Sequence, residues 1–258
     1  MNQDARENIG LIANNYFKST IALFETITFF NYSIASVYVD KNEKMVESFN
    51  KLEEIILEQK KEEKADSGAN QILTHMPSLC FSSLVSAFEN YLIEMLALAL
   101  KTHPHKIAKE SVDLKKVIEL SREEIILFKA NEYINQIMYK TPKDYLKSLS
   151  NILSLSEESI SQAFNMYIEI KARRDLGVHN NWRKNEIYER KIAEAKISPP
   201  TNNTLSPNLE YYKYAFTVCS FLVQKISNQT CEKLFKAHPI FDEKRFNSDI
   251  NNLTIPKD

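Results

Sequence analysis

Apolar residues recur along most of this chain at intervals of three and four, the spacing of one face of an α-helix. The pattern predicts helices over residues 6–38, 43–64, 78–101, 121–139, 142–153, 156–178 and 207–236. Only three glycines occur, and the hairpin dipeptides Asn-Gly and Asp-Gly are missing from the sequence. We therefore predict an all-α protein.

Four short motifs mark helix starts within this pattern. Ser121–Glu124 and Ser154–Glu157 have the form of a capping box, in which a serine and a glutamate satisfy each other's backbone N–H groups. Thr141-Pro142 and Ser206-Pro207 each place a capping residue before a proline suited to the first helical position. Each motif precedes one of the predicted helices.

Segments that interrupt the helical pattern predict the domain organisation of the chain. A charged segment over 60–68 ends at Gly68, which we interpret as a helix stop, and the proline-containing segment 197–206 is a loop. We expect an N-terminal helical hairpin over 1–68, a helical domain over 69–238 and a C-terminal tail over 239–258 with weak periodicity.

The composition and net charge of the chain indicate a globular protein and limit how it can bind nucleic acid. The 258 residues are 43% hydrophobic and 26% charged, which is typical of a globular protein, and the formal net charge is −1. A nearly neutral chain can bind nucleic acid only through a local basic patch. Cys80, Cys219 and Cys231 are odd in number and far apart, so we expect buried free thiols and a cytoplasmic location.

We expect neither a secretory signal nor a membrane span. The N-terminus lacks a basic stretch followed by an apolar run, and Glu25 and Asn31 interrupt the apolar residues 20–39.

The candidate chemistry lies at the end of the helix predicted over 156–178. The apolar arc of this helix contains Ile160, Ala163, Phe164, Met166, Tyr167 and Ile170, and Arg174 projects from the middle of the same arc. A guanidinium keeps its charge, and its desolvation costs several kcal/mol unless the group is paired. Either a carboxylate meets Arg174, or this end of the arc lines a cleft that receives an anion.

Glu89 is the carboxylate best placed for such a pairing, because it lies at the edge of the core stripe of the helix over 78–101. If the two helices pack face to face, Glu89 orients Arg174. The alternative is a glutamate that reaches solvent.

Further groups around Arg174 suit a phosphodiester with an adjacent base. Lys171, Arg173 and Arg183 supply positive charge, and Trp182 supplies a flat surface for stacking. We predict RNA contacts for these four residues.

His179 follows Arg174 by five positions, which places it about 140° around an ideal helix. The two side chains therefore meet only if the helix bends at Gly177 or if a second subunit brings them together across a two-fold axis.

The segment Arg174-Asp-Leu-Gly-Val-His179, followed by two asparagines, resembles the R-x4–6-H signature of HEPN-domain proteins. The helix before it and the earlier Ser-Ala-Phe-Glu-Asn-Tyr-Leu helix from Ser86 resemble the same family, over roughly residues 70–235. The resemblance implies a HEPN-like antiparallel helical bundle that forms a homodimer, with both motifs in one cleft. It further implies a metal-independent endoribonuclease of toxin–antitoxin or antiviral defence systems, whose partners are RNA and an antitoxin or regulatory protein.

On this resemblance Arg174 and His179 are the catalytic residues, and Glu89, Asp175 and Asn180 support them. Asp175 stands where the family commonly has asparagine. RNA supplies its own 2′-hydroxyl nucleophile, histidine can move protons at neutral pH, and arginine can stabilise charge on the phosphate. The expected products are a 2′,3′-cyclic phosphate and a 5′-hydroxyl, with no cofactor or metal.

Two other hypotheses for the function remain open. A catalytically inactive HEPN-like module would bind RNA, nucleotide or a protein partner through the same cleft, and a helical scaffold would pair Arg174 with Glu89 for structure alone. Two lesser signals have structural interpretations: His103-Pro-His105 is a loop without a third metal ligand, and Tyr211, Tyr212, Tyr214 and Phe216 are packing residues.

Overall fold

The computed structural model describes residues 2–39, 68–107, 111–242, 250 and 253–256. These residues form helices and no strand, so the predicted all-α class is confirmed for the part of the chain that the structure describes. The elements are α1 (Asn2–Val39), α3 (Gly68–Thr102), the 3₁₀-helix η1 (Pro104–Ile107), α4 (Leu114–Glu119), α5 (Arg122–Met138), α6 (Pro142–Leu153), α7 (Glu157–Asn180), α8 (Glu186–Glu194), α9 (Leu209–Gln229) and the π-helical turn η2 (Thr230–Leu234).

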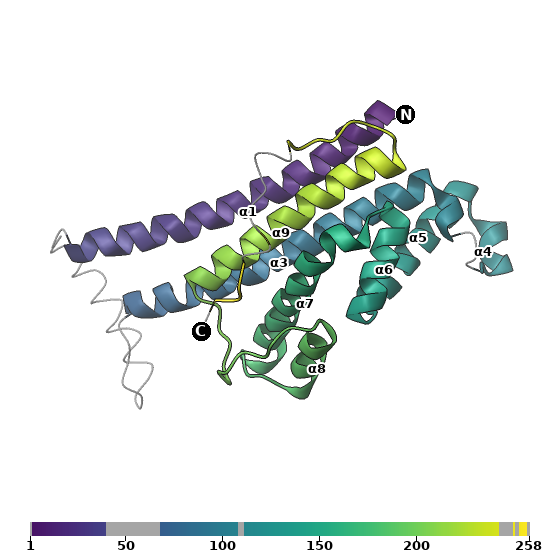
Figure 1. Cartoon of the computed structure of the whole chain (residues 1–258). Helices are drawn as coiled ribbons and strands as arrows, with labels where there is room; N and C mark the ends of the chain where they lie inside the picture. Colours follow the sequence, from purple (N-terminus) through teal and green to yellow (C-terminus); the bar gives the residue numbers. More distant parts are fainter. Residues whose placement is uncertain (1, 40–67, 108–110, 243–249, 251–252, 257–258) are drawn as a thin grey trace.

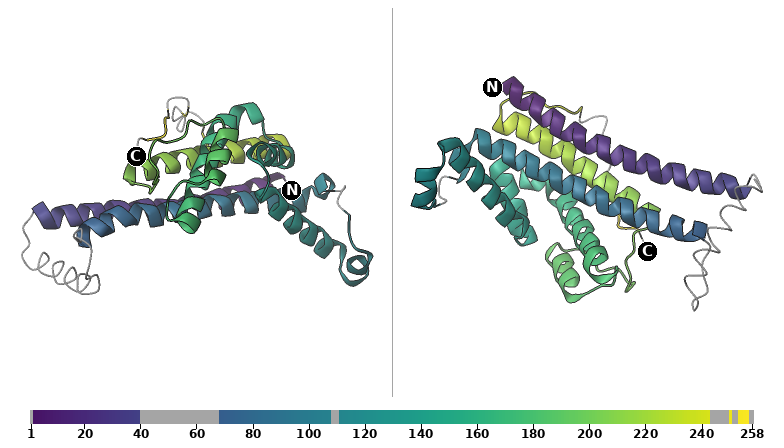
Figure 2. Two further views of the ribbon diagram at one scale, coloured as in Figure 1. Left: turned by 90° about the horizontal axis from the view of Figure 1, so that it is seen from below. Right: turned by 180° about the vertical axis from the view of Figure 1, so that it is seen from behind.

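Three long helices, α1, α3 and α9, lie side by side, and α1 runs opposite to the other two (Figures 1 and 2). The helices α5, α6, α7 and α8 project from one side of this layer (Figure 1). Ile9, Ala13 and Tyr16 of α1 belong to the same buried cluster as the core stripe of α3. The described part of the predicted N-terminal hairpin therefore shares one core with the bundle, and the helix predicted over 43–64 lies outside the described residues.

The helix α3 begins earlier than its pattern suggested. It starts at Gly68, where the sequence predicts the end of the preceding helix, and it continues through Pro77 to Thr102. Its stretch Met76–Thr102 is long and apolar enough to cross a membrane, by length and composition alone. Phe81, Leu84 and Phe88 in this stretch are fully buried against other helices, as in the central helix of a packed bundle.

Two of the four predicted helix starts are confirmed. Ser121 caps α5 in a complete capping box, in which its Oγ accepts from Glu124 N and Glu124 Oε2 accepts from Ser121 N at 2.8 Å. Thr141 caps α6 ahead of Pro142, with its Oγ1 accepting from Asp144 N at 3.3 Å.

The other two predicted starts are wrong. Ser154 ends α6 in the left-handed conformation (φ 59°), and the residue before α7 is Ser156. The helix α9 is capped by Asn208, whose Oδ1 accepts from Tyr211 N at 2.8 Å. The Ser206 hydroxyl does not cap this helix and lies 3.0 Å from that of Ser78.

The short helices α4 and α8 are absent from the predicted pattern. In α8, Tyr188 and Ile192 pack with Ala172, Leu176 and Leu205 in a second buried cluster. The following segment 197–206 contains no helix, as predicted, and pairs with the turn that follows α7 through one bridge between Arg183 and Thr204.

The described residues of the C-terminal segment are anchored to the bundle. Asn228 Oδ1 accepts from the backbone N–H groups of Ile240 and Phe241, both at 2.9 Å, and Arg6 Nε donates to the carbonyl of His238 at 3.2 Å. Ile250 is buried in the main core.

The packing interpretations of the cysteines and tyrosines are confirmed. Cys80, Cys219 and Cys231 are buried free thiols, and burial raises their pKa. Tyr211, Tyr212 and Tyr214 are buried, and Phe216 is half-buried beside Phe24.

Candidate functional site

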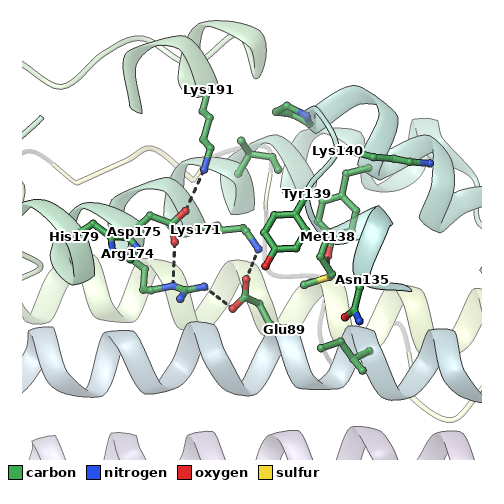
Figure 3. A pocket seen from close by; sticks show the side chains of 14 residues that line it. Glu89, Asn135, Met138, Tyr139, Lys140, Lys171, Arg174, Asp175, His179 and Lys191 are labelled. Atoms are coloured by element: carbon green, nitrogen blue, oxygen red, sulfur yellow. Dashed lines mark hydrogen bonds and ion pairs between the residues drawn. The ribbon is translucent and has the colours of Figure 1, made fainter. Parts of the chain in front are cut away.

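A cavity of about 600 Å³ opens between α3, α5, α6, α7 and α8 (Figure 3). The predicted residues Glu89, Lys171, Arg174, Asp175 and His179 all line it. The remaining lining residues come from the neighbouring helices and turns: Ile93, Asn135, Met138, Tyr139, Lys140, Pro142, Tyr145, Ile168 and Lys191.

The helix α7 supplies the largest share of the functional groups. Lys171, Asp175 and His179 recur every four residues and therefore share one face of the helix. Arg174 lies beside this face, and its long side chain reaches the same cavity. Because α7 continues unbroken to Asn180, the bend expected at Gly177 is not needed for Arg174 and His179 to line one cavity.

Glu89 pairs with two cations at once. Its Oε2 accepts from Arg174 Nη2 and its Oε1 accepts from Lys171 Nζ (Figure 3). Of the two alternatives that the sequence left open for Glu89, the structure shows the pairing with Arg174 and not a solvated glutamate. The Arg174 side chain stays 20% exposed, so this ion pair is partly open to solvent.

Asp175 also joins two cations. Its Oδ1 lies 3.5 Å from Arg174 Nε, and its Oδ2 accepts from Lys191 Nζ at 3.1 Å. Asp175 thereby helps to orient Arg174 and holds α8 against α7 at the edge of the cavity (Figure 3).

The cavity carries more positive than negative charge. Four cationic side chains (Lys140, Lys171, Arg174 and Lys191) and two carboxylates line it, an excess of two positive charges when His179 is neutral. Since each carboxylate is shared between two cations, the site favours an anionic ligand. Burial raises the pKa of Tyr145 in the cavity wall, and the nearby Glu89 carboxylate raises it further, so this phenol stays neutral.

The prediction that Arg173 contacts RNA is wrong. Its side chain is 0% exposed, its Nε donates to Glu169 Oε1 at 2.9 Å, and its guanidinium lies 3.7 Å from the centroid of the Tyr211 ring. Tyr188 and Tyr211 also donate to the Glu169 carboxylate. This network is internal and links α7 to α8 and α9.

The structure does not bring Asn180, Trp182 or Arg183 to the cavity. The Trp182 ring lies against Gly177, where an added Cβ would be 2.4 Å from the ring, and near Phe81. The amide of Asn180 donates to the carbonyl of Arg183 at 2.7 Å. The Trp182 ring is therefore partly buried against the protein and lies away from the residues that line the cavity.

Tyr139, Lys140 and Lys191 line the cavity but were not predicted as site residues. Tyr139 and Lys140 follow the end of α5, and Lys191 lies on the unpredicted α8. No local motif marks them, because only the packing of α5, α6 and α8 around α7 brings them to the site.

His103 and His105 have ring centroids 5.8 Å apart. Over the described ranges of the chain, no group of three histidine, cysteine, aspartate or glutamate side chains could hold a metal ion.

No protein-family model, curated protein or solved structure matches this chain.

Proposed function

We propose that this protein is a metal-independent endoribonuclease of the HEPN type. The observation that supports this proposal is the presence of Arg174 and His179 on one cationic cavity, within a helical fold. An arginine, a histidine and three lysines line a cavity of about 600 Å³, which suits the binding of a nucleotide and its phosphate.

The reaction needs little chemistry from the protein, because RNA carries its own nucleophile. The 2′-oxygen forms a bond to the adjacent phosphorus, the bond from phosphorus to the 5′-oxygen breaks, and the products are a 2′,3′-cyclic phosphate and a 5′-hydroxyl. The proton of the 2′-hydroxyl leaves to a base, and the 5′-oxygen receives a proton from an acid. Arg174 holds the phosphate oxygens and stabilises the charge that develops on them.

Each cavity supplies one imidazole among the described residues that line it, whereas the reaction uses an acid and a base. We propose that His179 serves one of these roles and that His179 of a second copy serves the other, in a homodimer with two-fold symmetry. Lys171 and Lys191 bind phosphates that flank the cleaved one.

Glu89 and Asp175 act as positioning residues in this scheme. Both contact the Arg174 guanidinium, which presents several N–H donors, so two carboxylates can orient it while it binds a phosphate. The cytoplasmic setting, the role in toxin–antitoxin or antiviral systems and the antitoxin or regulatory partner are proposed from the sequence resemblance.

A second candidate is a catalytically inactive module that binds RNA, nucleotide or a protein partner in the same cavity. The ion pair between Arg174 and Glu89 favours an inactive protein, either this module or a helical scaffold, because it neutralises the guanidinium that the reaction requires. The two candidates differ in whether bound RNA is cut.

The test is incubation of the purified protein with mixed RNA in excess chelator. We expect His179→Ala and Arg174→Ala to lower the cleavage rate at least about 100-fold, the usual contribution of such groups. His238→Ala and Arg122→Ala are matched controls, because these exposed side chains lie outside the cavity, and both should cleave at the wild-type rate.

Cleavage at the wild-type rate by His179→Ala and Arg174→Ala would exclude these residues as the catalytic pair. RNA binding by the wild-type protein without any cleavage would favour the inactive module.

A further inference from the structure

One side chain of the cavity is far more exposed than its neighbours. Two tyrosines line the site: Tyr145 is 2% exposed and Tyr139 is 91% exposed. Tyr139 directly follows α5, and its backbone N–H donates to the carbonyl of Gln136 at 3.4 Å. The helix end thus fixes the backbone of Tyr139 while its ring stays uncovered.

The surroundings of Tyr139 differ from those of two other partly exposed aromatic residues, Phe128 and Trp182. Phe128 is 37% exposed, but the Lys116 ammonium lies 3.4 Å from the centroid of its ring. The Trp182 ring packs against Gly177. Of these three rings, Tyr139 alone combines an open surface with a place on the cationic cavity.

The charges beside Tyr139 are held in place by the protein. Lys140 Nζ donates to the Ser148 hydroxyl at 3.0 Å and lies 5.5 Å from the centroid of the Tyr133 ring. Lys171 and Lys191 are fixed across the cavity by Glu89 and Asp175 (Figure 3). An open aromatic ring next to fixed cations is the arrangement by which proteins bind single strands, with a base on the ring and phosphates on the cations.

We propose that Tyr139 is the platform on which an unpaired nucleobase of a strand bound in this cavity stacks. The bases of a duplex stack within the helix and present no free face to a protein ring, so a paired strand would not use Tyr139. The identity of the ligand as RNA rests on the proposed function, whereas the stacking contact can be measured separately.

The test measures binding of a short single-stranded DNA oligomer, because stacking uses the base and the missing 2′-hydroxyl prevents the proposed cleavage. We expect Tyr139→Ala to weaken binding about 5- to 100-fold, the usual effect of losing one stacked base. Tyr139→Phe keeps the ring and should bind as the wild type does. Phe128→Ala is the control for loss of an aromatic side chain outside the cavity.

Two further probes separate stacking from general loss of affinity. An abasic oligomer of the same length should bind Tyr139→Ala and the wild type equally, and a duplex of the same sequence should bind more weakly than the single strand. Equal single-strand binding by Tyr139→Ala and the wild type would overturn the proposal. Absent single-strand binding, or preference for the duplex, would overturn it as well.

The outcome is distinguishable from failure of the proposed function. A protein that binds the single strand through Tyr139 but never cuts RNA would retain the stacking site and lose the nuclease assignment. If the protein cuts RNA in a His179-dependent way but its binding is insensitive to Tyr139→Ala, the nuclease assignment stands and the stacking site is excluded.

Discussion

Arg173 and Arg174 are neighbours in the sequence but lie in opposite environments. The buried face of α7 contains Ile160, Phe164 and Tyr167 in its first half, whereas Ala172, Arg173 and Leu176 are buried near its end. The apolar pattern correctly placed Arg174 on the first of these faces. The pattern carries no sign that α8 covers the opposite face beyond Ile170, so the sequence alone predicts that Arg173 contacts RNA.

The first prediction concerns the buried pair. Arg173→Ala leaves the Glu169 carboxylate buried without its cation, and loss of one partner of a buried pair costs about 3–5 kcal/mol of unfolding free energy. The exposed Arg183 is the matched control, and Arg183→Ala should change stability by less than about 0.5 kcal/mol. Urea denaturation measures both values, and similar stabilities for the two variants would contradict the structure.

The second prediction uses two helical glycines with different surroundings. A Cβ at Gly177 would lie 2.4 Å from the Trp182 ring, whereas the nearest atom to a Cβ at Gly10 is Ile240 Cδ1 at 4.0 Å. Gly10→Ala should stabilise the protein by about 0.5–1 kcal/mol through helix propensity, and Gly177→Ala should destabilise it.

Trp182→Ala provides the control for this clash. In that background Gly177→Ala should no longer destabilise the protein, because the ring that opposes the Cβ is gone. A destabilising effect of equal size in both backgrounds, measured by thermal unfolding, would show that Trp182 is not the cause.

Among the helices, a short sequence motif predicted the start of a helix correctly only where the capping hydrogen bond joins residues close together in the chain. Ser121 and Thr141 cap helices as predicted because each bond joins residues three positions apart. Ser154 also begins a sequence of the capping-box form, yet it ends α6. The helix α7 begins only after Ser156. The helix α8 buries only Tyr188 and Ile192, which gives too little periodicity to detect.

The third prediction concerns α8, which carries Lys191 to the cavity. Asn185 caps this helix, with its Oδ1 accepting from Tyr188 N at 2.9 Å. Asn185→Ala should weaken the helix by about 1 kcal/mol and raise amide hydrogen exchange in α8 above that in α6. Asn202→Ala, in the exposed loop, is the control, and equal exchange in the two variants would exclude this capping role.

At the scale of the whole molecule, the pattern predicted the helices of the bundle but not which of them share a core. The predicted boundary at residue 68 followed charge and glycine, yet α1 packs along α3 and α9. Contacts between segments so distant in the sequence have no local signature. The cavity could not be predicted for the same reason, because residues of five helices that are distant in the sequence line it.

The fourth prediction tests whether α1 stabilises the bundle. Ile9 is 0% exposed and Leu11, two positions along the same helix, is 57% exposed. Ile9→Ala should lower the unfolding free energy by about 2–5 kcal/mol and lower hydrogen-exchange protection in α9, whereas Leu11→Ala should have little effect on either. Unchanged protection in α9 after Ile9→Ala would indicate that α1 folds separately from the rest.

We propose that Arg174 and His179 act together on RNA without a metal. The most direct measurement is the end chemistry of RNA fragments formed in excess chelator by the wild type and by His179→Ala. We expect 2′,3′-cyclic phosphate and 5′-hydroxyl ends from the wild type, and no fragments above background from the variant. Fragments with 5′-phosphate ends, or cleavage that survives His179→Ala at the wild-type rate, would contradict it.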